Sequence, residues 1–236
     1  VMTVTVSIAS GTDNLISAFP ELNPWRIEIA VGFLLALCAV NLRGVRESGV
    51  AFAIPTYLFI GSIGILIFTG LARIVFGHDL MAPSAHYEVL PMADMANLSQ
   101  AAGTLLLLRA FASGCSALTG IEAIANGVQA FRKPKIKNAQ TTLVMMGVVA
   151  ITMLIGVTSL ALISNVHYAE FPCEQLPQWT ECATSPQLSV MAQIGSAVFG
   201  QGSILFYLLQ AATAAILLLA ANTAFNGFPL LASVLA

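Results

Sequence analysis

Residues 141–164 contain no charged side chain, and neither do residues 203–226. A helix needs about 20 consecutive, mainly apolar residues to span the hydrocarbon core of a bilayer. Over the whole chain, 58% of the residues are hydrophobic and only 8% are charged, whereas a soluble domain carries roughly 25% charged residues. The sequence therefore predicts an all-α integral membrane protein.

The apolar runs predict one transmembrane domain over 1–236, with crossings at 1–17, 27–41, 52–76, 101–131, 141–164 and 203–226. A helix over about 186–199 is too short to span, so we expect it at the outer interface, with Ser185 as N-cap and Pro186 as its first residue. The tripeptide "GFP" after Asn226 predicts a break in the last crossing. No signal-peptide pattern opens the chain, and both of its ends lie in apolar runs, as expected for the middle of a longer protein.

The basic residues predict the orientation in the membrane. They concentrate in two loops, as Arg43 and Arg46 and as Arg132, Lys133, Lys135 and Lys137, whereas residues 165–185 contain no lysine or arginine. Because short cytoplasmic loops collect positive charge, we expect loops 42–51 and 132–140 to be cytoplasmic. Segments 77–100 and 165–202 are then outside.

The stretch "SGCSALTGIEAIANG", residues 113–127, interrupts the fourth crossing. Gly114, Gly120 and the small residues between them lower the cost of unwinding that helix, and unwound backbone at membrane depth lines the ion and substrate sites of secondary transporters. Glu122 lies in this stretch, where a carboxylate costs at least ~2–3 kcal/mol on insertion scales. Because such a group is either protonated or paired with a cation, Glu122 is a candidate for coupling transport to protons.

Other polar residues within crossings have a structural and a functional interpretation. Thr119 precedes Glu122 by three residues, so both could face one cavity. Thr3 and Ser7 are four apart and share a helix face, where hydroxyls are more often contacts between helices. Asn222 is interpreted as a packing or capping residue, and Arg109 could extend to the outer interface or pair with Asp13.

Four cysteines are present. Cys38 and Cys115 lie within crossings and are interpreted as small hydrophobic residues. Cys173 and Cys182 lie nine residues apart in a predicted outer segment, where a disulfide is chemically permitted. Sequence spacing leaves open whether they are bonded.

The segment "SALTGIEAIANG", followed by "FRKPKIKNAQTTL", resembles the sixth helix and the next loop of the amino acid–polyamine–organocation (APC) superfamily. The segments "SIASGTDNLISAFPEL", "NLRGVRESG", "FAIPTYLF" and "NTAFNGFPLLA" resemble helices three, four, five and eight of its branch of KimA-type, high-affinity potassium importers. This resemblance implies a partial LeuT-like fold of two inverted repeats, with this chain covering helices three to eight. It also implies a potassium site at Thr3, Ser7, Thr119 and Glu122.

The resemblance favours a proton-coupled potassium transporter, with potassium and protons as the transported species, no cofactor and no nucleic-acid partner. The expected partners are the lipid bilayer and a small cation or small-molecule substrate, with a homodimer among the assemblies that the chain could form. An amino-acid or polyamine permease of the same fold is the alternative. An enzyme is not expected, because all three histidines lie outside the crossings and no HExxH motif occurs. A channel or a structural scaffold fits the buried carboxylate less well.

Overall fold

The computed structural model describes residues 2–42, 49–90, 103–105, 107–108, 111, 133–169, 171–179, 182 and 185–235. The chain divides into two compact units, Val1–Val89 with Val157–Ala236 (unit 1) and Leu90–Gly156 (unit 2). Most of the predicted fourth crossing lies outside the described residues, including Gly114, Gly120, Thr119, Glu122, Arg109 and Cys115.

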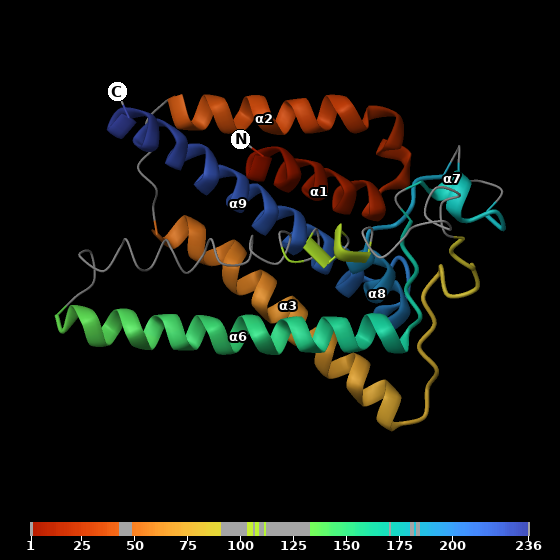
Figure 1. Ribbon diagram of the computed structural model, residues 1–236. Helices are drawn as coiled ribbons and strands as arrows, with labels where there is room; N and C mark the ends of the chain where they lie inside the picture. Colours follow the sequence, from red (N-terminus) through yellow and green to blue (C-terminus); the bar gives the residue numbers. More distant parts are fainter. Residues whose placement is uncertain are drawn as a thin grey trace. The chain divides into compact units, whose positions relative to one another are not determined.

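The described residues form helices and loops, and no strand occurs among them (Figure 1). The elements are α1 (Met2–Ala18), the 3-10 helix η1 (Pro20–Trp25), α2 (Arg26–Leu42), α3 (Gly49–Val75), α6 (Lys135–Ile163), α7 (Pro172–Gln175), α8 (Val190–Phe199) and α9 (Ile204–Leu235). A helix therefore covers each predicted crossing that the structure describes.

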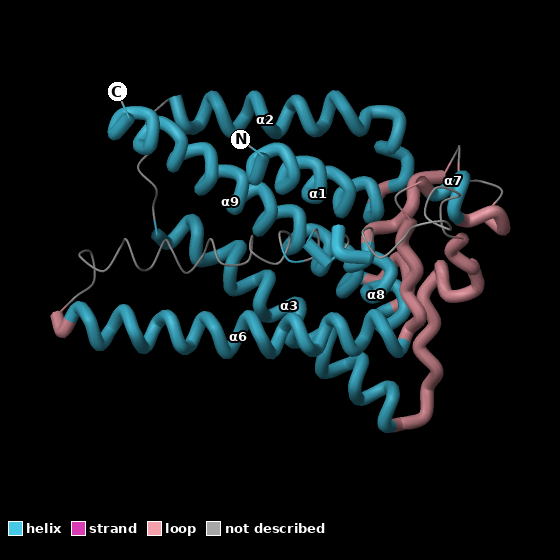
Figure 2. The backbone as a smooth tube through the Cα atoms, viewed as in Figure 1, coloured by secondary structure: helices cyan, strands magenta, loops and turns pink. Residues whose placement is uncertain are grey.

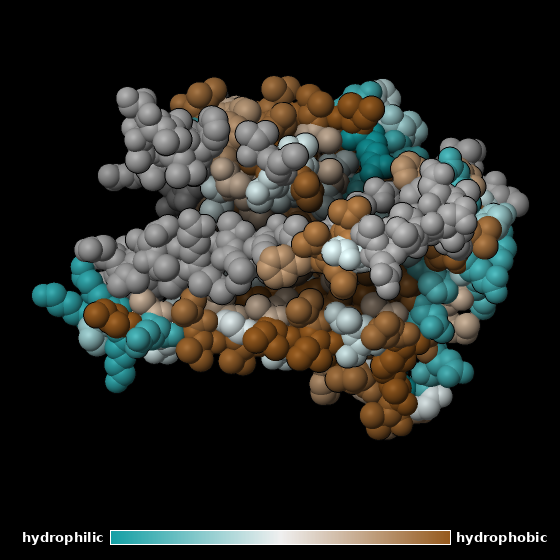
Figure 3. All heavy atoms as spheres, in the orientation of Figure 1, coloured by the Kyte–Doolittle hydropathy of each residue, from teal (hydrophilic) through white to brown (hydrophobic). Residues whose placement is uncertain are grey.

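Four of the described helical segments are long and apolar enough to cross a membrane: Pro20–Leu42, Phe52–Val75, Lys135–Ile163 and Ile204–Phe225. Their side chains are largely turned outward, and no residue of α2 is buried. Ile27, Leu35 and Leu42 are examples of its exposed hydrophobic residues, and apolar surface covers α2 in Figure 3. A helix that is apolar all round suits a membrane span, because lipid or further helices can cover its surface.

Unit 1 is built around α1 and α9, which pack against each other along their lengths (Figure 1). Val4 and Ile8 of α1 form a buried cluster with Ala221 of α9, and Phe33 and Leu37 of α2 pack against it. Gly11 lies at this contact, where a Cβ atom built on it would lie 3.6 Å from the Leu217 Cβ atom, an ordinary van der Waals distance. Small residues at helix contacts let backbones come together in membranes, where no hydrophobic force drives helices to associate.

The loops of unit 1 that the structure describes collect at one end, which we call the loop end: residues 76–89 and 164–189, together with α7 and α8 (Figure 2). The Ala82 backbone N–H donates to the Ser164 carbonyl at 2.9 Å, and the Glu88 N–H donates to Gln178 Oε1 at 2.8 Å. Two segments that the charge pattern places on one side of the membrane are thus hydrogen-bonded to each other. Which side of the membrane they face stays a prediction.

Two helix boundaries differ from the predictions. α8 begins at Val190, four residues later than expected, because Ser189 rather than Ser185 caps it and accepts a hydrogen bond from the Ala192 N–H at 3.2 Å. α9 runs to Leu235, through Gly227 and Pro229, where a break after Asn226 was expected. In an apolar run, a helix satisfies its own backbone groups, which outweighs the hydrogen bond lost at one proline.

Unit 2 is described mainly through α6, from Lys135 to Gly156. Thr141, Thr142 and Thr152 each donate a side-chain hydrogen bond to the carbonyl four residues earlier, at 2.8–2.9 Å. The helix thereby satisfies its own hydroxyl groups.

One polar pair joins α2 to α9 within their apolar faces. Asn41 Nδ2 donates to Asn222 Oδ1 at 2.9 Å and to the Leu37 carbonyl at 2.8 Å, and Asn222 is buried. The interpretation of Asn222 as a packing residue is therefore supported by a direct contact.

We expect Asn41→Leu or Asn222→Leu to destabilise the full-length protein by about 0.6–1.7 kcal/mol, from the average to the maximum that double-mutant cycles give for hydrogen bonds between membrane helices. Thermal unfolding of both single variants and of the double variant, in one detergent, measures the coupling between the two positions. If the two single effects add in the double variant, the amides do not interact, and this contact is wrong.

Candidate functional site

Helix α1 supplies the two predicted site residues that the structure describes. Ser7 is buried, with 8% of its surface exposed, between the core residues Val4 and Ile8, whereas Thr3, one turn earlier, is exposed. Both lie in the N-terminal half of α1, which packs against the C-terminal half of α9. The structure thus places one predicted hydroxyl in a helix contact and leaves the other open on the surface of unit 1.

The convergence of Thr3 and Ser7 with Thr119 and Glu122 stays a prediction, because Thr119, Glu122, Gly114 and Gly120 lie outside the described residues. What the structure adds is a rigid support for α1. Thr12 donates to the Ile8 carbonyl at 2.9 Å, and Ser17 donates to the Asp13 carbonyl at 2.7 Å. These hydroxyls are satisfied within α1, so the helix can be buried despite its polar composition.

A polar cluster at the C-terminal end of α1 attaches α8 to it. The Ser189 N–H donates to Ser17 Oγ at 3.0 Å, and Ser189 Oγ donates to Asn14 Oδ1 at 2.9 Å. Together with its bond from the Ala192 N–H, Ser189 therefore caps α8 and binds it to α1 at the same time. Sequence analysis missed these contacts, although a serine before an apolar helical run is a common N-cap pattern.

Asp13 pairs with Arg26, a partner that sequence analysis did not predict. Arg26 Nη2 lies 2.5 Å from Asp13 Oδ1. The turn formed by η1 folds the start of α2 back beside the end of α1, which brings the two charges together. Arg109 lies outside the described residues.

A second buried network joins residues 84, 167 and 193. Ser84 Oγ accepts a hydrogen bond from the His167 N–H at 2.8 Å and donates to Gln193 Oε1. Gln193 Nε2 donates to the carbonyls of His167 and Leu188 at 3.2 and 3.1 Å. The network therefore attaches α8 to the loop segment that contains Ser84 and to the loop segment that contains His167.

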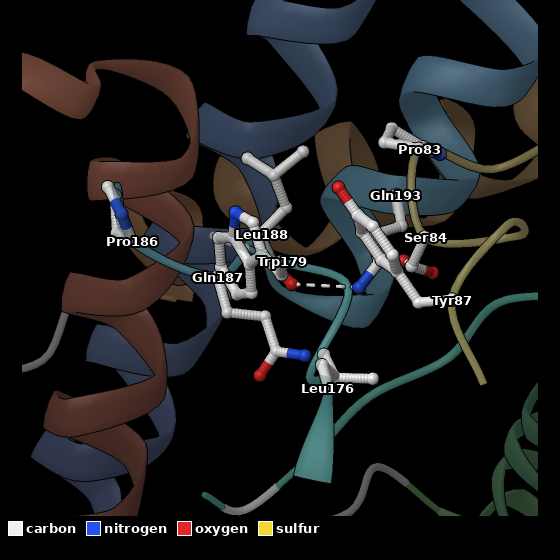
Figure 4. Close-up of a pocket in the computed structure, with 9 residues that line it drawn as sticks. All are labelled: Pro83, Ser84, Tyr87, Leu176, Trp179, Pro186, Gln187, Leu188 and Gln193. Carbon is white, nitrogen blue, oxygen red and sulfur yellow. Dashed lines mark hydrogen bonds between the residues drawn. The ribbon is translucent and has the colours of Figure 1, made fainter. Parts of the chain in front are cut away.

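A pocket of about 140 Å³ opens beside this network (Figure 4). Its walls include Tyr87 and Trp179, whose rings stack with centroids 6.3 Å apart, and the buried side chain of Leu176. The dashed line in Figure 4 is the hydrogen bond from Gln193 to the Leu188 carbonyl. Because the Gln193 and Ser84 groups already bond within the network, the pocket presents mainly aromatic and apolar surface.

Cys173 and Cys182 form a disulfide in the structure, with their Cα atoms 5.3 Å apart. It closes the segment that carries α7 at the loop end. Cys38 on α2 is free and half-buried, in agreement with its interpretation as a small hydrophobic residue. Gln210 of α9 is a further residue that sequence analysis missed: its amide is 1% exposed and makes no hydrogen bond among the described residues.

The described architecture is that of a multi-pass membrane protein: apolar helices with outward hydrophobic surfaces, and polar contacts confined to helix interfaces and the loop end. The profile of the amino acid permease family matches residues 1–236. The chain therefore belongs to the amino acid permease family, which places it among membrane permeases rather than enzymes.

A relative extends the comparison. The chain is 40% identical, over 237 aligned residues, to the protein named "Potassium transporter KimA" of Bacillus subtilis (strain 168). The alignment covers 100% of this chain and 35% of that relative. The chain thus spans about a third of the length of the curated relative that it matches.

Proposed function

We propose that this chain forms the central part of a secondary transporter that takes up potassium ions, driven by protons. The observation that carries the proposal is the 40% identity to a potassium transporter over the whole chain. The alignment covers the whole chain, so it includes α1, α9 and the segment that contains Glu122. The proposed fold is a LeuT-like pair of inverted repeats, of which these helices form the middle.

The proposed cation site consists of the hydroxyls of Thr3, Ser7 and Thr119 with the Glu122 carboxylate. Hydroxyl and carbonyl oxygens can replace the hydration shell of potassium, and Glu122 supplies a charge that a proton can replace. The buried position of Ser7 beside α9 supports this proposal, because an ion site at membrane depth needs a rigid wall shielded from water. Protonation of Glu122 after the cation leaves would complete the coupling.

The experiment is rubidium uptake by the full-length protein in proteoliposomes, with and without an acidic exterior. We expect concentrative uptake that increases with the proton gradient and that excess potassium abolishes. Amino acids and polyamines at the same concentration should leave it unchanged. Absence of rubidium uptake by folded, inserted protein would overturn the proposal.

An amino-acid or polyamine permease is the second candidate, favoured by the description of the matching family. The same proteoliposomes, given a panel of radiolabelled amino acids and polyamines, test it directly. Accumulation of one of these compounds without rubidium uptake would assign the chain to this alternative.

A further inference from the structure

A second cavity lies at the loop end, at the C-terminal end of α1. Its volume is about 260 Å³, far above the space that one water molecule needs. Four segments of unit 1 line it: α1 contributes Asp13, η1 contributes Asn23, α2 contributes Arg26, and the loop segment 164–189 contributes Tyr168 and Ser185 among others. Most of these side chains end in a charged or hydrogen-bonding group.

Two covalent or hydrogen-bonded contacts hold the walls of this cavity in place. Cys182, which lines it, is joined to Cys173 by the disulfide. Ser189, which lines it from the other side, is bound to Asn14 and Ser17 of α1. The cavity is therefore a preformed feature rather than a gap between loosely packed loops.

Among the described residues that line the cavity, one is positively and one is negatively charged, and the two are in contact with each other. The Asp13 and Arg26 side chains are 30% and 56% exposed, and their N···O distance is 2.5 Å. An ion pair with this much water around it contributes little stability. A ligand that offers both charges can therefore replace each partner of the pair at little cost.

We propose that this cavity binds a small zwitterion, with the ligand carboxylate on Arg26 and the ligand ammonium on Asp13. The Arg26 guanidinium would repel a simple cation, and the Asp13 carboxylate would repel a simple anion. Binding of either kind of ion is therefore disfavoured. The planar guanidinium matches a carboxylate with two parallel hydrogen bonds. Asn23, Tyr168 and Ser185 provide further neutral hydrogen-bonding groups.

Neither Thr3 nor Ser7, the two described residues of the proposed cation site, lines this cavity. Asp13 lies six residues beyond Ser7 on α1, which is about 9 Å along a helix. The proposal does not depend on which substrate the transporter carries, and its test separates the two sites. Because Ser189 contacts both the cavity and α8, a bound ligand would also touch the residue that attaches α8 to α1.

The test is equilibrium binding of radiolabelled glycine to the purified full-length protein in detergent. We expect saturable binding at one site, weakened at least tenfold by Arg26→Gln and by Asp13→Asn. Glu28→Gln is the matched control: it removes an exposed charge from the same turn of α2 but outside the cavity, and it should leave binding unchanged. Glu122→Gln should also leave binding unchanged.

Competing ligands test the chemical class. Acetate and methylammonium each carry one of the two charges, so each should compete at least tenfold more weakly than glycine. Glycine betaine distinguishes N-methylated zwitterions from free amino acids as ligands. If it competes with glycine, the site accepts both kinds of zwitterion; if it does not compete, the site accepts free amino acids. Equal competition by acetate or methylammonium would overturn the proposed class.

Three other results would overturn the site itself: no glycine binding by the wild type at millimolar concentration, binding unaffected by Arg26→Gln, or binding lost in Glu122→Gln. If both single variants fail to fold, the exchanged pair Asp13→Arg with Arg26→Asp keeps both charges in the cavity. Glycine binding by the folded exchanged variant supports the proposal, and its loss there contradicts it.

Discussion

Replacing Glu122 by glutamine is expected to abolish concentrative rubidium uptake by the full-length protein at micromolar cation concentration. Glutamine keeps the size and the hydrogen bonds of the side chain but removes its charge. A cation held by hydroxyls and one carboxylate then loses its only countercharge in the proposed site. Removing one partner of a buried charge pair costs about 3–5 kcal/mol, which corresponds to an increase in KM of roughly two to four orders of magnitude.

The same substitution separates the two roles proposed for Glu122. If it also exchanges protons, any uptake that remains at high rubidium concentration should no longer respond to an acidic exterior. Glu28→Gln, on the exposed first turn of α2, is the matched control and should keep both the KM and the response to the gradient. A Glu122→Gln variant with wild-type KM and wild-type proton dependence would show that Glu122 is not part of the cation site.

The membrane-crossing helices were predictable because one property determines them. A crossing was expected over 27–41, and α2 extends over Arg26–Leu42; one was expected over 52–76, and α3 extends over Gly49–Val75. Hydrocarbon forces every backbone group into an internal hydrogen bond, so a long apolar run has helix as its main option. The boundaries of α8 and α9 depend on tertiary contacts and on a tolerated proline, and there the local pattern was wrong.

The candidate site was predictable only in part, for a different physical reason. Ser7 was identified by its spacing and by resemblance, and its burial agrees with a role inside the protein. The contacts of Ser189 with Asn14 and Ser17 join residues 175 and 172 positions apart. Such contacts depend on how distant helices pack against each other, and this packing cannot be read from local patterns in one sequence. The Asp13–Arg26 pair, only 13 residues apart, depended on how η1 turns the chain.

A graded series at Gly11 tests whether the contact of α1 with α9 controls the proposed site. Gly11→Ala should be neutral or slightly stabilising, because an added Cβ atom would lie 3.6 Å from Leu217 Cβ and 3.7 Å from the Ala214 carbonyl oxygen, both ordinary contacts. Alanine also favours helix over glycine by about 0.5–1 kcal/mol. Gly11→Leu adds three carbon atoms beyond that Cβ, with the α9 backbone in their path. Overpacking of this kind costs about 1–3 kcal/mol or more.

We therefore expect Gly11→Leu to lower the Tm of the full-length protein. Because moving α1 away from α9 also displaces Ser7, we expect rubidium uptake to fall by more than the loss of folded protein accounts for. Gly32→Leu is the matched control, since nothing lies within 4 Å of a Cβ atom built on Gly32 in α2. It makes the same chemical change on an open helix face and should leave both measurements near wild type. If Gly11→Leu and Gly32→Leu behave alike, α1 and α9 are not in close contact in the working protein. Wild-type uptake by a destabilised Gly11→Leu variant would instead place the cation site away from α1.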